Sequence, residues 1–284
     1  MFKSFLKILL SVIVCTFVYV LANAVMPFSQ GLKELGASSD PMGMFYLVFV
    51  AAFVCLTMYY IIKQAQFGGM KLFIRMVFSM FFVQIFMAQI ETLFFGYAFP
   101  VLTNLDVKLI MIAGLIPLLA TTPILLKFFQ NKNSVVEKQK IDVEIMLKKL
   151  GIIGVIYVFV YFIFGYFAAW QFEELRVFYS GSPVKLGFFA HLADMAKTNP
   201  IIYPFQFLRG ILFGFFVIPL MVVFKTKKTF ITGICLIYLY LGVIFIMPNI
   251  MFPNMVRLGH FIELTTSMLL FGIIVGNILW RKDQ

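Results

Sequence analysis

Eight long apolar runs constrain the fold of this chain more than any other feature of its sequence. Each run has about 20 residues, the length that crosses the hydrocarbon core of a bilayer as a helix. Short polar segments join the runs and leave no room for a soluble domain. The sequence therefore predicts one all-α integral membrane domain over residues 1–284, a polytopic bundle of about eight transmembrane helices. The predicted spans are 6–26, 44–62, 72–95, 107–129, 150–169, 201–224, 230–247 and 258–279.

Charge is sparse and unevenly placed along the chain. Charged residues make up 12% of the 284 positions and hydrophobic residues 62%, whereas soluble domains carry about 25% charged residues. The net charge is +11, and lysine and arginine gather in alternate connections and at both chain ends, which is typical of cytoplasmic segments. We therefore expect an N-in/C-in protein of the inner (cell) membrane, with membrane lipids as partners and no nucleic acid.

The longest connection, 130–149, is rich in lysine and carries interleaved apolar residues. That pattern is typical of a short amphipathic helix on an anionic leaflet. This cytoplasmic connection divides the spans into two groups of four, 1–129 and 150–284.

The largest outer loop lies between the fifth and sixth runs. Within it, Ser182 and Pro183 have the form of a helix cap and a first helical position. Apolar residues then recur about every third position until Asn199 and Pro200 end the pattern. We expect one interfacial helix here, on the outer face of the membrane.

Polar residues inside the spans concentrate toward the outer ends of the third, fifth, sixth and eighth runs. A charged side chain at mid-membrane costs roughly 2.5–3.5 kcal/mol on insertion scales, so such groups must pair or face a wet cavity. Gln84 and Glu91 share a helical face, and Gln89 points elsewhere. We predict a polar cavity that opens outward among these four helices. Its expected substrate-binding residues are Gln171, Glu174, Arg176, Gln206, Arg209 and Arg257.

His260 and Glu263 place an imidazole and a carboxylate on one face of the eighth span. A carboxylate can orient the ring and raise its basicity, which is what a general base needs. We assign His260, Glu263 and Glu91 as candidate catalytic residues. His260 and Glu263 could also supply two ligands of a metal site, with Glu91 or His191 as a third, but two histidines and no usable cysteine favour no metal site. The cofactor is left unknown.

Glu173 and Glu174, followed at a distance by His191 and His260, resemble the catalytic pattern of the CAAX-protease and bacteriocin-immunity family of intramembrane proteases. The resemblance implies that these four residues form the catalytic set. The family's arginine falls four residues after the second glutamate, at Phe178 here, while Arg176 comes two residues earlier. The family's phenylalanine, four residues before the first histidine, is replaced by Gly187. These departures leave the chain without a family assignment.

Three classes of function fit the sequence. The first is a membrane-embedded enzyme that acts at the outer leaflet on a lipid, lipoprotein or lipid-linked substrate. The second is a transporter or ligand-binding protein for an ion or small anion, and the third is an accessory scaffold. A further possibility for Arg209 is a buried ion pair with Glu91 or Glu263 that only orients helices. The enzyme class is favoured because the polar groups gather at one leaflet rather than along a path through the membrane.

Overall fold

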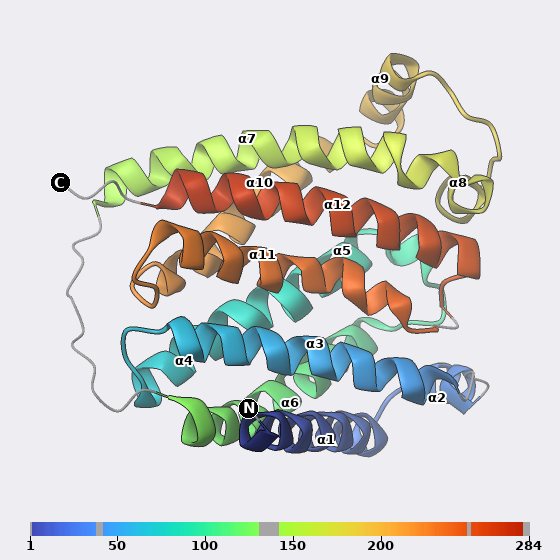
Figure 1. The fold of residues 1–284 in the computed structure, drawn as a ribbon. Coiled ribbons are helices and arrows are strands. Elements are labelled where there is room, and N and C mark those ends of the chain that lie inside the picture. The colour runs from blue at the N-terminus through green and yellow to red at the C-terminus, as the bar shows by residue number, and fades with distance from the viewer. Residues whose placement is uncertain (1, 38–41, 131–141, 249–250, 281–284) are drawn as a thin grey trace.

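The computed structural model describes residues 2–37, 42–130, 142–248 and 251–280, and in this part of the chain the regular elements are helices (Figure 1). Eight of the helical segments are long and apolar enough to cross a membrane, which makes the chain a multi-pass membrane protein in contact with lipid. The spans are α1 (Phe2–Val25), α3 (Met42–Gln64), the continuous series α4 (Gly69–Met80), η1 (Phe81–Phe86) and α5 (Met87–Phe94), α6 (Asn104–Phe129), α7 (Val143–Phe167), α10 (Ile202–Val217), α11 (Lys227–Val243) and α12 (Asn254–Leu279).

Each half of the chain packs mainly with itself. In the first half, α1 lies against α3 and α6, and α3 also contacts α6. In the second half, α7 lies against α10 and α12, and α11 packs along α12. The halves meet where α11 contacts α3 and η1, in the middle of the bundle (Figure 1). The buried side chains from both halves form one continuous apolar cluster.

Glycines allow α7 and α10 to approach closely. A Cβ atom at Gly210 would lie 2.5 Å from the Tyr157 Cβ and 2.8 Å from the Gly154 Cα. Small residues at helix contacts are the usual means of close packing in membranes, where lipid competes with apolar side chains for contact. This contact brings α10, and with it Arg209, against α7.

We expect Gly210→Ala to lower the stability of the protein by about 1–3 kcal/mol, because the added methyl group overpacks the α7–α10 contact. Gly151→Ala on α7 is the matched control, since a Cβ there meets nothing within 4 Å. Alanine at that position should be neutral or stabilising by up to about 1 kcal/mol, following helix propensity. Thermal unfolding in detergent micelles measures both effects, and equal melting temperatures for the two variants would contradict the close-packing role of Gly210.

The two ends of the bundle differ in charge. At one end, Lys7 lies over the rings of Phe128 and Phe129, and Lys149 Nζ donates a hydrogen bond to the Leu279 carbonyl. We call this the basic end. Its described lysines and arginine are Lys3, Lys7, Lys63, Lys71, Arg75, Lys127, Lys148, Lys149, Lys225, Lys227 and Lys228.

Three short helices lie at the opposite end, on the right of Figure 1: α2 (Gln30–Ala37), α8 (Glu173–Ser180) and α9 (Phe188–Thr198). The expected interfacial helix corresponds to α9, but it begins after Gly187 rather than at Pro183. Ser182 Oγ instead accepts a hydrogen bond from the Val184 N–H, and the Pro183 carbonyl accepts one from Arg176. These contacts hold the 182–184 segment as a turn, so the predicted start was wrong.

The expected amphipathic helix in the 130–149 connection can be compared with the structure only in part. Residues 131–141 lie outside the described residues. The segment from Val143 to Lys149 forms the first two turns of α7 and is no separate surface helix. Asp142 caps it by accepting a hydrogen bond from the Ile145 N–H, which explains why the helix extends seven residues beyond the apolar run.

Candidate functional site

A cavity of about 1360 Å³ opens within the half of the bundle that carries α2, α8 and α9. Its lining includes residues of all four spans among which the sequence predicts a polar cavity, namely α5, α7, α10 and α12. It also extends further, to α1, α2, α6 and α11. Most of the lining side chains are apolar or aromatic, which is usual for a ligand site.

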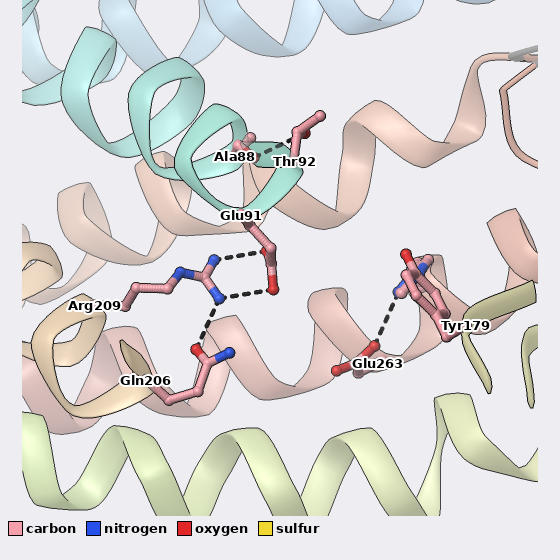
Figure 2. Close-up of polar contacts among 8 residues, drawn as sticks. Ala88, Glu91, Thr92, Tyr179, Gln206, Arg209 and Glu263 are labelled. Atoms are coloured by element: carbon pink, nitrogen blue, oxygen red, sulfur yellow. Dashed lines mark hydrogen bonds and ion pairs between the residues drawn. The ribbon is translucent and has the colours of Figure 1, made fainter. Parts of the chain in front are cut away.

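Glu91 and Arg209 form a bidentate ion pair at this cavity (Figure 2). Both guanidinium–carboxylate contacts, Nη1 to Oε1 and Nη2 to Oε2, measure 2.7 Å. Arg209 Nη1 also donates to Gln206 Oε1 at 2.9 Å. The Arg209 side chain is 4% exposed and that of Glu91 is 31% exposed. Both residues line the cavity, and the carboxylate is the more exposed member of the pair.

Aromatic rings surround the guanidinium. Its Cζ lies 5.6 Å from the Tyr157 ring, 5.7 Å from Phe205 and 5.8 Å from Phe213. Such contacts stabilise a cation that has left water. Arg209 Nε and Gln206 Nε2 are buried without a hydrogen-bond partner in the described structure. Among the described residues, Glu91 is the acidic partner that compensates this buried cation.

The direction in which Glu91 points depends on η1, a π-helical segment that runs directly into α5. The Met87 N–H donates to the Phe82 carbonyl, five residues earlier. In such a turn, residues five apart lie one above the other. Gln84, Gln89 and Glu91 consequently all line the cavity. The sequence interpretation that Gln89 points elsewhere assumed an unbroken α-helix and was wrong.

A second cluster of polar side chains at the cavity wall connects α8 to α12. The hydroxyl of Tyr179 lies 3.0 Å from His260 Nε2, and His260 Nδ1 lies 3.1 Å from Glu263 Oε2. The side chains of His260 and Glu263 are 16% and 9% exposed. Figure 2 shows Glu263 and Tyr179 at the two ends of this series, apart from the Glu91–Arg209 pair. The three residues form a hydrogen-bonded chain from a carboxylate to a phenol.

Burial raises the pKa of Tyr179 well above its ordinary value of 10, and the carboxylates of Glu91 and Glu263 add to the effect. Tyr179 therefore keeps its proton at neutral pH, and its hydroxyl can donate to His260 Nε2. In the tautomer that accepts this hydrogen bond, the ring carries its proton on Nδ1 and donates to Glu263 Oε2. This tautomer places the basic nitrogen of His260 directly behind the Tyr179 hydroxyl.

The sequence reading missed Tyr179 because it treated the chain after Trp170 as a loop. The structure has α8 there, and Gly181 ends it with the positive φ of 69° that a left-handed C-cap requires. Arg176 fixes the adjoining turns through hydrogen bonds from Nε to the Pro183 carbonyl and from Nη1 to the carbonyls of Trp170 and Gln171. A glycine after an eight-residue amphipathic segment was the available signal.

The remaining predicted site residues are placed outside the cavity lining. Gln171 donates to the Tyr166 carbonyl and accepts from Lys185, and Glu174 is exposed on α8. Arg257 donates to Asn254. Gln206 reaches the site only through Arg209. The structure thus gathers Glu91, Arg209, His260 and Glu263 at one cavity and leaves the other predicted residues as its supports or neighbours.

His191 also lines the cavity, from α9. Its ring lies 4.9 Å from that of Trp170 and 5.7 Å from that of Tyr166. Burial lowers the pKa of His191 below its ordinary value, so the ring is neutral at pH 7. Among the described residues, no three histidine, cysteine or carboxylate side chains converge as metal ligands. Glu173 and Glu174 are both exposed on α8 and, unlike the two histidines, do not line the cavity.

The fold and the cavity define a helical, multi-pass membrane protein with a polar site in one half of the bundle. Comparison with protein-family models, with curated proteins and with solved structures finds no match to this chain.

Proposed function

We propose that the protein is an integral membrane enzyme that acts on a lipid, lipoprotein or lipid-linked substrate inside the cavity. The observation that carries this proposal is the hydrogen-bonded chain Tyr179–His260–Glu263 at the wall of a large, mainly apolar cavity. His260 acts as the general base and Glu263 holds its ring and stabilises the charge that develops on it. A base of this kind contributes roughly 10²–10⁴ to a reaction rate.

The Tyr179 hydroxyl connects the base to the substrate. It covers His260 Nε2 and itself lines the cavity. A hydroxyl or water of the substrate complex passes its proton to the Tyr179 oxygen while the Tyr179 proton moves to Nε2. The net result is a deprotonated nucleophile and an imidazolium that is paired with Glu263. Glu91, which Arg209 fixes in position, supplies a second carboxylate to the same cavity.

The position of the site in the membrane follows from the charge at the two ends of the bundle. Cytoplasmic ends of membrane proteins carry an excess of lysine and arginine, and the basic end has eleven such residues in the described chain. We therefore place both termini in the cytoplasm and the α8–α9 end outside, in the cell membrane. The cavity then opens toward the outer leaflet.

A continuous transport path is less consistent with the distribution of buried charge. The buried charged residues of the described chain are Asp106, Arg176, Arg209 and Glu263. All four lie in the half that carries the cavity, while the buried polar groups near the basic end are hydroxyls such as Thr57, Ser79 and Thr121. Ions or charged solutes would need compensating groups along the whole route.

The test compares lipid extracts and lipoproteins of cells that carry the wild-type chain, His260→Gln or Glu263→Gln. His191→Gln is the matched control, because it changes the other histidine of the same cavity without touching the hydrogen-bonded chain. Membrane-inserted protein is quantified in each strain. We expect a lipid species that changes with the wild type and the control, and reverts in both His260 and Glu263 variants.

Extracts that do not differ between wild-type and empty cells, although the protein is folded and inserted, would refute the enzyme. Flux assays for ions and small solutes would then test transport, and isolation of associated membrane proteins would test a scaffold. A lipid species that changes as much with His260→Gln as with the wild type would show that other residues carry out the reaction.

A further inference from the structure

The charged residues that line the cavity determine which head group it can hold. Two of them, Arg209 and Glu91, neutralise each other through both arms of the guanidinium. In the part of the chain that the structure describes, Glu263 forms an ion pair with the imidazole of His260 and with no arginine or lysine. Asp194 and Lys33 also line the cavity, on α9 and α2. The lining therefore has three carboxylates against two basic side chains, counted without the imidazoles.

Arg209, which the sequence assigns to substrate binding, has a guanidinium that is already occupied by Glu91, and this argues against binding of an anionic head group. An anion would have to displace the carboxylate of Glu91 from a bidentate pair whose arginine is only 4% exposed. It would also approach Glu263, whose charge repels it in a medium of low dielectric constant. His191 adds no compensating charge, because burial lowers its pKa and leaves it neutral at pH 7.

The two carboxylates, Glu91 and Glu263, line the same cavity. The rings of Tyr157, Tyr161 and Tyr179 line it as well. A cation between the carboxylates would thus meet aromatic faces as well as negative charge, the combination that binds ammonium groups in proteins.

The rest of the cavity suits a long apolar chain. It continues from α7 and α9, at the top of Figure 1, across the bundle to α1, α2 and α6 at the bottom. There it is lined by side chains such as Met26, Leu32, Ile110 and Ala113. Lys33 is the one charged side chain that the described lining contributes on this side. The volume of about 1360 Å³ exceeds the usual 300–1,000 Å³ of a small-molecule site.

We infer that the cavity binds an amphiphile with a cationic amine head group, held between Glu91 and Glu263, and a hydrocarbon chain that extends between α1, α2 and α6. The inference rests on the proposed function in that it names the substrate class of the same site. It concerns binding alone, and so it can hold or fail independently of any reaction.

The chain provides its own reporter for this binding. Of its two tryptophans, Trp170 lines the cavity, and Trp280 packs on Phe230 at the basic end. In a Trp280→Phe background the emission of Trp170 reports on occupancy. The purified full-length protein, in a nonionic detergent at pH 7, is titrated with dodecylamine, dodecyl phosphate and ethylamine.

We expect dodecylamine to bind at least about 10-fold more tightly than dodecyl phosphate, because opposite charges interact strongly in a partly buried site. It should also bind far more tightly than ethylamine, which lacks the chain. Glu263→Gln should weaken dodecylamine binding by about 10-fold, whereas Glu144→Gln, which neutralises an exposed carboxylate on α7 outside the cavity, should leave it unchanged.

Equal or tighter binding of dodecyl phosphate would overturn the inference, and so would an amine preference that survives Glu263→Gln. The three-probe comparison uses the native carboxylates, so it decides the question even where Glu263→Gln fails to fold. Selective amine binding without a lipid product would refute the enzyme and leave the binding site. A lipid product that depends on His260, without selectivity for the amine, would support the enzyme and refute the amine-binding site.

Discussion

Replacing Glu91 with leucine should destabilise the protein by about 3–5 kcal/mol, the range found when one partner of a buried ion pair is removed. The substitution leaves the Arg209 guanidinium, which is 4% exposed, without its acidic partner. The nearest remaining contacts are the Gln206 amide oxygen and the rings of Tyr157, Phe205 and Phe213. A total stability of about 5–15 kcal/mol makes such a loss large enough to reduce the folded population.

The double variant Glu91→Leu/Arg209→Met distinguishes the effect of the charges on stability from the effect of the volume that the two side chains fill. An apolar pair of similar size often restores the stability that a single substitution removes. We expect the double variant to recover at least half of the loss, although Gln206 then lacks its partner. Thermal unfolding in detergent of the wild type, both single variants and the double variant completes the cycle. Additive losses would show that Glu91 and Arg209 are not coupled.

Replacing Tyr179 with phenylalanine should lower activity nearly as much as His260→Gln, by roughly 10²–10⁴. The phenylalanine ring keeps the contacts with Phe95 and His260 but removes the hydroxyl that covers Nε2. A base that works through this hydroxyl loses its route to the substrate. If the substrate reaches Nε2 directly, only one hydrogen bond is lost, a change of about 1 kcal/mol or about fivefold.

The lipid species identified in the extract comparison provides the assay for this prediction. Initial rates are measured for the wild type, Tyr179→Phe and His260→Gln at equal amounts of inserted protein. The pKa of Tyr179 is raised above 10, so the hydroxyl stays protonated in the folded state as pH rises through 10. Its hydrogen bond contributes stability below pH 10 and is lost only at higher pH. An alkaline loss of activity below pH 10 would therefore require another group, and Tyr179→Phe with about a fifth of wild-type activity would refute the relay.

The spans could be predicted from the sequence because bilayer thickness fixes the length of each apolar run. All eight predicted runs fall on helices of the structure, with ends that differ by up to seven residues, and polar caps such as Asp142 and Thr103 extend some of the helices. The sequence also showed that the charged side chains inside the spans gather toward one end of four runs, because such side chains are costly in a membrane and few. His260 and Glu263 follow from helical spacing alone.

Other features depend on contacts that one sequence does not encode locally. Arg209 had two candidate carboxylates, and only the packing of α10 against α7 and the π-helical turn at η1 bring it to Glu91. The short helices α2 and α8 have eight residues each, too few for a clear hydrophobic period. Tyr179 was missed for that reason. Arg176 was assigned to a substrate from its charge, whereas its Nε and Nη1 donate to backbone carbonyls that fix the turns around α8.

The central claim is that Glu91, His260 and Glu263 face one wet cavity that opens on the outer side. Two neighbouring positions of α12 test it most directly. Leu264 lines the cavity, while Ile262, at nearly the same depth, is 39% exposed on the outside of the bundle. Both lie about 12–15 Å from the start of α12, at about 1.5 Å rise per residue. Each is changed to cysteine after the three buried native cysteines, Cys15, Cys55 and Cys235, are replaced by alanine.

The measurement is the rate of labelling in intact cells by a membrane-impermeant thiol reagent, which needs water and an ionised thiol. We predict that Leu264→Cys is labelled from outside and that Ile262→Cys, which faces lipid, is labelled at least about 10-fold more slowly. Inserted and folded Leu264→Cys that resists the reagent, or that reacts no faster than Ile262→Cys, would contradict the open cavity and with it the proposed site.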